Sequence, residues 1–137
     1  MTHTPGFLAI VEDAKTRVTE ITATAYAALI EAGAPNILID VREESEWTAG
    51  HAAGAIHLGK GIIERDIESR LPDRDATLIL YCGGGYRSAL AGDAIQKMGY
   101  KNVLSLAGGW RAWKESGLPI EVGPKGSEAF LITGPHR

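Results

Sequence analysis

The stretch at positions 77–98 constrains this chain most, because it joins a short apolar run, a cysteine, three glycines and a helical pattern. The run from Thr77 to Tyr81 has the length and composition of a buried strand. Cys82 follows directly, and Gly83-Gly84-Gly85 can adopt backbone angles that other residues avoid. Apolar residues then recur at i, i+3, i+4 and i+7, which predicts a helix with Ser88 as its N-cap.

This order of residues favours a reactive cysteine. A thiol that lies between the end of a strand and the start of a helix faces unpaired backbone N–H groups and the positive end of the helix dipole. The N–H groups of a glycine-rich loop can also converge on an anion, and Arg87 adds a permanent positive charge. Each feature stabilises a thiolate, the nucleophilic form of cysteine. An isolated cysteine is more often a small apolar core residue, so the combination is what predicts a nucleophile at Cys82.

Four segments, in the usual order, resemble the motifs of the rhodanese family, which are sulfurtransferases. The resembling segments are Asp40–Trp47, Gly50–Ile56, the loop Cys82–Ser88, and Gly108–Trp113 together with Gly117–Pro119. The resemblance covers about residues 20–120. It departs from the family at Ala52 and Ala53, where Ile-Pro is usual, and this change concerns the local shape of a loop rather than the chemistry.

The resemblance implies a sulfurtransferase that needs neither an organic cofactor nor a metal ion. The Cys82 thiolate would attack the outer sulfur of a small anionic donor such as thiosulfate, release sulfite and carry a persulfide. Cyanide, a small thiol or a protein thiol would then accept the sulfur, which predicts ping-pong kinetics. With Cys82 as the catalytic residue, the residues expected to bind substrate are Gly83, Gly84, Gly85, Tyr86, Arg87, Ser88 and Arg42.

Two other functions remain open at this point. Related domains that act as phosphatases or arsenate reductases use a similar Cys…Arg loop, but with one more residue than the four that separate Cys82 from Arg87 here. A persulfide carrier that serves one partner protein is the second alternative, and Tyr86 is then either a partner contact or a ring packed over the glycines. Arg42 has two interpretations as well: it braces the loops beside the site, as the resemblance implies, or it attracts an anion.

Two histidines raise the question of a metal site. The spacing of His51 and His57 matches no His-based zinc motif, and Cys82 is 25 positions beyond His57. We therefore expect both histidines to have structural roles. The pair of aromatic residues at Trp110 and Trp113 is expected to pack in the core rather than to bind a ligand.

The expected strands and helices alternate, which predicts a single α/β domain with a mainly parallel central sheet flanked by helices. Ligands bind at the carboxyl ends of the strands in such sheets, where Cys82 is expected. We predict three parts: a helical extension at 1–19, a rhodanese-like domain at 20–120 and a tail at 121–137 with an apolar patch at 130–132.

The extension is expected to be an amphipathic helix of about four turns that starts at Thr4-Pro5 and has a stripe of apolar residues reaching Ile21. Its apolar stripe packs on the domain or forms a dimer contact, so the oligomeric state is open. A second helix is expected after Thr22 or Thr24, with Ala25, Ala28, Leu29 and Ala32 on its buried face.

Composition excludes several classes of protein. The 137 residues suit one domain, and 45% hydrophobic with 23% charged residues is typical of a soluble globular chain. A net charge of −3 without a long run of one sign gives no reason to expect nucleic acid or an acidic membrane as a partner. The apolar runs are too short to cross a bilayer, and no signal-peptide pattern is expected at the N-terminus. A single cysteine excludes an internal disulfide and suits the reducing cytoplasm.

Overall fold

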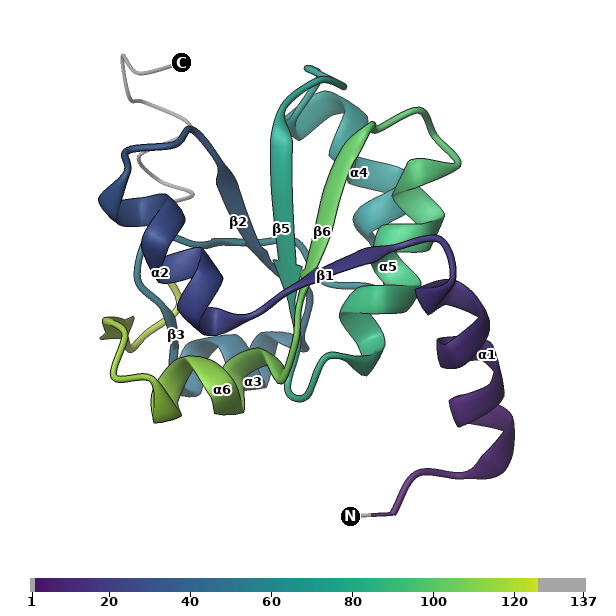
Figure 1. Ribbon diagram of the computed structural model, residues 1–137, viewed down its shortest axis with the longest axis horizontal. Coiled ribbons are helices and arrows are strands. Elements are labelled where there is room, and N and C mark those ends of the chain that lie inside the picture. Colours follow the sequence, from purple (N-terminus) through teal and green to yellow (C-terminus); the bar gives the residue numbers. More distant parts are fainter. Residues whose placement is uncertain (1, 126–137) are drawn as a thin grey trace.

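The computed structural model describes residues 2–125, in which strands and helices alternate (Figure 1). The helices of this part are α1 (Pro5–Lys15), α2 (Ala23–Glu31), α3 (Glu44–Ala49), α4 (Ile63–Arg70), α5 (Tyr86–Gln96) and α6 (Gly109–Glu115). Its strands are β1 (Thr19–Ile21), β2 (Ile37–Asp40), β3 (His51–Ala52), β4 (Ile56–His57), β5 (Thr77–Tyr81), β6 (Asn102–Leu106) and β7 (Ile120–Glu121).

Five strands form one parallel sheet in the order β1-β6-β5-β2-β4, with β5 at the centre. This confirms the predicted α/β fold with a mainly parallel sheet. β3 and β7 form a separate antiparallel pair. The register places Leu80 opposite Ser105, so β5 and β6 end side by side. The loops that follow them therefore meet at the carboxyl edge of the sheet, where a doubly covered parallel sheet binds its ligands.

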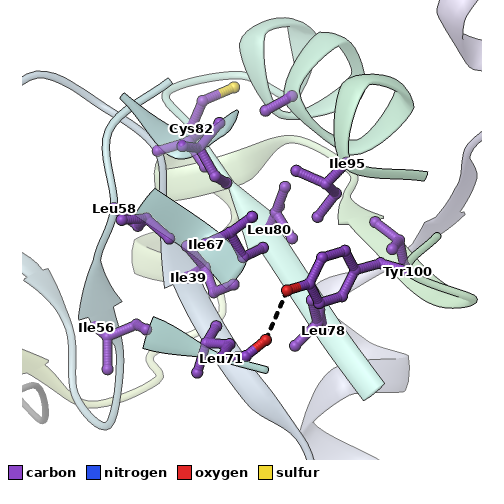
Figure 2. Close-up of a cluster of buried hydrophobic side chains, with 14 residues drawn as sticks. Ile39, Ile56, Leu58, Ile67, Leu71, Leu78, Leu80, Cys82, Ile95 and Tyr100 are labelled. Atoms are coloured by element: carbon purple, nitrogen blue, oxygen red, sulfur yellow. Dashed lines mark hydrogen bonds between the residues drawn. The ribbon is translucent and has the colours of Figure 1, made fainter. Parts of the chain in front are cut away.

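Each face of the sheet carries its own hydrophobic cluster, because successive side chains of a strand point to opposite faces. Leu78, Leu80 and Cys82 belong to the cluster that α4 and α5 cover, and Figure 2 shows Cys82 at one end of that cluster. Ile79 and Tyr81 belong to the opposite cluster, which α2 and α6 cover. In Figure 1, α4 and α5 accordingly lie on one side of the sheet, and α2 and α6 on the other. The alternation thus directs the thiol toward α5.

The N-terminal helix is present, but the prediction of about four turns was wrong. α1 ends at Lys15; Val18 lies beyond it and is buried, while Ile21 belongs to β1 at the edge of the sheet. The apolar stripe continues past the helix because Val18 is buried in the turn that follows it, and Ile21 is partly buried in a strand. α1 packs along α5 (Figure 1), and this packing accounts for the buried side of the helix.

The buried face of α2 also differs from the prediction. Thr22 caps the helix, as expected, by accepting a hydrogen bond from the Ala25 N–H at 3.1 Å. Ala25 itself is exposed, however, and the buried residues are Ala23 and Tyr26. In an alanine-rich helix the spacing does not distinguish one stripe from the next, so the large ring of Tyr26 decides which stripe packs on the sheet. The apolar patch expected at 130–132 lies outside the described residues.

Candidate active site

Cys82 is the residue around which the site is built. It follows β5, and only 1% of its surface is exposed. The backbone N–H groups of Gly85 and Ser88 donate hydrogen bonds to its Sγ atom, at 3.1 Å and 3.3 Å. Donors aimed at sulfur stabilise a negative charge on it. The structure therefore forms the inward-facing N–H cradle that the glycine-rich loop predicted.

The start of α5 differs from the sequence-based expectation. The helix begins at Tyr86 and its N-cap is Gly85, whereas Ser88 lies inside the first turn. Gly85 adopts φ 98°, a left-handed conformation that favours glycine. A Cβ atom at this position would also lie 3.3 Å from the Gly108 backbone nitrogen. The prediction of Ser88 as N-cap was therefore wrong, because the turn that positions the loop needs a glycine there.

The Ser88 hydroxyl group instead lies next to the sulfur atom of Cys82. Its Oγ lies 3.5 Å from Cys82 Sγ and 2.7 Å from the Oγ of Ser105 on β6. Both serines are fully buried, so the hydrogen bond between their hydroxyl groups takes the place of bonds to water. Ser105 was not predicted as part of the site, because it lies 17 positions from Ser88 in a segment that looked like an ordinary strand.

The first half of the loop is held by the beginning of α6. The Trp110 N–H donates to the Cys82 carbonyl at 2.7 Å, and the Arg111 N–H donates to the Gly83 carbonyl at 3.3 Å. Gly109 makes this approach possible, since a Cβ atom there would lie 2.3 Å from the Cys82 carbonyl oxygen. Nothing in the sequence pattern around Gly108-Gly109 pointed to a contact with the cysteine loop.

Arg87 lies beside the loop and is paired with Glu46 of α3. Its Nη1 and Nη2 atoms donate to the two carboxylate oxygens of Glu46, at 2.8 Å and 3.1 Å. The hydrogen bonds from Arg87 lower the pKa of Glu46, and the same contact raises the pKa of Arg87. The pair therefore carries its charges at neutral pH. Glu46 was not predicted as a site residue, because its partner is 41 positions away.

Arg42 belongs to a buried network with Asp40 and Tyr81. The side chain of Arg42, with 3% of the residue exposed, pairs with Asp40 at 2.8 Å and donates to the Gly50 carbonyl at 2.6 Å. The Tyr81 hydroxyl donates to the same carboxylate at 2.5 Å, and burial raises the pKa of this tyrosine. Trp110 covers the guanidinium group, whose Cζ is 4.8 Å from the ring centroid. These contacts suit the bracing role of Arg42.

Tyr86 forms the rim of the site together with the N-terminal helix. Its ring packs edge-on against His3, with 4.4 Å between the ring centroids, and lies 6.1 Å from the ring of Phe7. Lys15 Nζ lies 5.3 Å from the centroid of the same ring. The tyrosine therefore contacts the N-terminal extension rather than covering the glycines alone.

The two central histidines both make hydrogen bonds to main-chain carbonyl groups. His51 Nδ1 lies 2.8 Å from the Trp47 carbonyl oxygen, and His57 Nε2 lies 2.8 Å from that of Arg42. Residues 2–125 contain no group of three or more His, Cys, Asp or Glu side chains that could hold a metal ion.

Over the same residues, no helix combines the length and the apolar character that a bilayer crossing requires.

The chain matches the rhodanese-like domain model over residues 22–116. It is 33% identical over 103 residues to the thiosulfate sulfurtransferase GlpE of Haemophilus influenzae, covering 75% of this chain and 94% of that protein. It is 37% identical over 94 residues to the probable adenylyltransferase/sulfurtransferase MoeZ of Mycobacterium tuberculosis, covering 68% of this chain but only 24% of that longer protein.

Solved structures agree with this match. The structure of RPA3614 from Rhodopseudomonas palustris, described as a protein of unknown function and possible tyrosine phosphatase, has a TM-score of 0.76 and 32% identity. The match covers 88% of this chain and 98% of that one. The thiosulfate sulfurtransferase of Pseudomonas aeruginosa has a TM-score of 0.71 and 27% identity over 77% of this chain and 20% of that one. Because the rhodanese-like domain model matches more than half of the chain, residues 22–116, the chain belongs to the rhodanese family.

Proposed function

We propose that this protein transfers a sulfane sulfur from a small anionic donor, with thiosulfate as the working case, to a nucleophilic acceptor. The observation that carries the proposal is the pair of backbone N–H groups, from Gly85 and Ser88, that donate to Cys82 Sγ. They stabilise the thiolate before the reaction, and the same loop offers further N–H groups to the outer sulfur of a persulfide. The reducing cytoplasm suits a thiol of this kind.

The first step forms a persulfide on Cys82. The thiolate attacks the outer sulfur of thiosulfate, a bond forms between the two sulfur atoms, and sulfite leaves with the electron pair of the bond that breaks. In the second step, cyanide, a small thiol or a protein thiol attacks the outer sulfur, and the Cys82 thiolate is the leaving group. Arg87 lies beside Gly83, where its charge is paired with that of Glu46.

Intact-protein mass spectrometry tests the proposal directly. After brief incubation with thiosulfate, the wild-type chain should gain one sulfur atom, and cyanide should remove it as thiocyanate. The Cys82→Ser variant should gain none. Equal sulfur transfer by wild type and Cys82→Ser would rule out the proposed route.

A persulfide carrier that serves a partner protein is the second candidate. One comparison favours it: the chain is 29% identical over 96 residues to the putative sulfur carrier protein YrkF of Bacillus subtilis, covering 70% of this chain and 51% of that protein. A carrier would gain the sulfur from thiosulfate, keep it in the presence of cyanide, and release it to a protein thiol. Phosphate-ester hydrolysis that depends on Cys82 would instead support the phosphatase alternative.

A further inference from the structure

Two guanidinium groups flank the glycine loop, and they come from different helices. Arg87 extends from α5 beside Gly83, where a Cβ atom would lie 3.1 Å from Arg87 Nη2. Arg111 extends from α6 beside Gly84, where a Cβ atom would lie 3.7 Å from Arg111 Nη2. The outer face of Gly84 thus lies between the Tyr86 ring, 3.6 Å from the same Cβ position, and the guanidinium group of Arg111.

The two arginines differ in how their charge is balanced. Both terminal nitrogens of Arg87 donate to Glu46, so this pair adds almost no net charge to the mouth of the loop. Arg111 is exposed and forms no ion pair within residues 2–125. Its charge is therefore the one beside the loop that remains available to an anion.

The backbone of Arg111 is fixed relative to the reactive sulfur. Its own N–H donates to the Gly83 carbonyl at 3.3 Å, and the preceding N–H, from Trp110, donates to the Cys82 carbonyl at 2.7 Å. The base of the side chain therefore keeps its position next to the loop, and only the side-chain rotamer has to adapt to a ligand. Less conformational freedom is lost on binding when the group is held in this way.

We propose that Arg111 binds the anionic group of the sulfur donor, while the Arg87–Glu46 pair braces the loop. This inference rests on the proposed sulfur transfer and adds the residue that recognises the donor, whose outer sulfur is bonded to a sulfonate or a similar anionic group. The leaving group of thiosulfate is sulfite, which carries away the electron pair and the negative charge. A guanidinium group at the rim pairs with that charge before and during departure of the leaving group.

The test measures how fast Cys82 gains a sulfur at increasing thiosulfate concentrations, by rapid quenching and intact mass spectrometry. The Arg111→Gln variant should need about tenfold more thiosulfate for half-maximal loading, the loss expected for one charge-assisted hydrogen bond. Arg111→Lys should lie between this variant and wild type. Lys101→Gln is the matched control, because it removes one positive charge near the start of β6, at the opposite edge of the sheet, and should load like wild type.

A second measurement does not depend on sulfur transfer. Iodoacetate and iodoacetamide alkylate a thiolate in the same way, with loss of iodide, but only iodoacetate is an anion. The ratio of the two alkylation rates at Cys82 should fall in Arg111→Gln and stay at the wild-type value in Lys101→Gln. An unchanged iodoacetamide rate shows that the loop of the variant is intact.

The outcomes separate the two proposals. Failure of the wild-type chain to gain sulfur would overturn the proposed function with thiosulfate, and the alkylation ratio would still decide whether Arg111 attracts anions to the thiol. Wild-type loading together with an unchanged half-maximal concentration and an unchanged ratio in Arg111→Gln would overturn the role of Arg111 alone. An equal loss of both alkylation rates in that variant would also overturn it, because such a loss indicates a structural effect.

Discussion

The guanidinium group of Arg17 donates two hydrogen bonds to the carboxylate of Asp93, 76 positions further along the chain, at 2.8 Å and 2.9 Å. This contact joins the turn after α1 to the buried side of α5, the helix that begins at the cysteine loop. Arg17→Ala should therefore lower the thermal midpoint by several degrees, since it leaves a mostly buried carboxylate without its main partner. Thermal unfolding followed by circular dichroism measures the change.

Arg65→Ala is the control for that substitution. Arg65 also pairs with an aspartate, its neighbour Asp66, but its side chain is 73% exposed. Removal of an exposed pair changes stability little, so the midpoint should stay close to that of the wild type. Equal effects of the two substitutions would contradict the importance of the contact between α1 and α5.

Acid should weaken the same contact. The hydrogen bonds from Arg17 lower the pKa of Asp93 below its ordinary value of 3.8. A lowered carboxyl pKa contributes stability that is fully present above the ordinary value and is lost as pH falls through the folded-state value. The difference in urea midpoint between wild type and Asp93→Asn should thus be constant from pH 7 to about pH 5 and should shrink below pH 3.8.

A difference that instead grew with acid would contradict the direction of this shift. Asp75→Asn provides the comparison, because Asp75 pairs with Lys101 at 3.5 Å through side chains that are 76% and 73% exposed. Its effect on the urea midpoint should be small at every pH.

Gly109→Ala should disrupt the site. The new Cβ would lie 2.3 Å from the Cys82 carbonyl oxygen, so the loop or the helix has to move. We expect a loss of about 3 kcal/mol or more in the free energy of unfolding, measured in urea. Loading with thiosulfate should fall with it, because the displaced atoms belong to the cysteine loop.

Gly117→Ala separates this clash from the conformational effect of a positive φ. Gly117 has φ 71°, but no atom lies within 4 Å of its Cβ position. The substitution should cost only about 1–2 kcal/mol, the penalty of the left-handed conformation itself, and should leave loading unchanged. Similar losses at both positions would show that the approach of Gly109 to Cys82 has no special effect.

Ser105→Ala should affect the thiol through Ser88. The Ser88 hydroxyl, which lies between the other two groups, would lose its 2.7 Å partner while it remains buried. Loss of one hydrogen bond of a buried hydroxyl costs about 0.5–1.5 kcal/mol, and the Ser88 hydroxyl then keeps only Cys82 Sγ, 3.5 Å away, as a partner. A changed rate of alkylation of Cys82 by iodoacetamide would support this positioning role, and a rate equal to that of the wild type would contradict it. Ser69→Ala, at an exposed position of α4, is the matched control.

The sequence predicted those features of the fold that depend on local patterns. β5 has the predicted bounds because it is a short apolar run between polar or turn-forming residues. The nucleophile could be located because a strand, a cysteine and three glycines are consecutive in the chain. The apolar stripe of α1, in contrast, predicted a helix that is too long, since Val18 is buried and Ile21 partly buried without being helical.

The remaining site residues depend on contacts between elements that are distant in sequence. Glu46 is one of three acidic residues between Asp40 and Trp47, and only the fold brings it to Arg87. Ser105 and Gly109 reach Cys82 because β6 lies beside β5 in the sheet. A pattern along the chain contains no information on these distances, so the fold had to be known first.

The groups that hold Cys82 belong to the backbone. The N–H groups of Gly85 and Ser88 donate to its Sγ atom, and the Trp110 N–H donates to its carbonyl oxygen. Every residue except proline has a backbone N–H, so exchange of a polar side chain for any other does not remove these donors. A deep mutational scan for sulfur transfer should therefore be least tolerant at the glycines that shape the backbone and at the cysteine. The residues that such a site requires for activity are therefore mostly small ones, and few polar side chains are required.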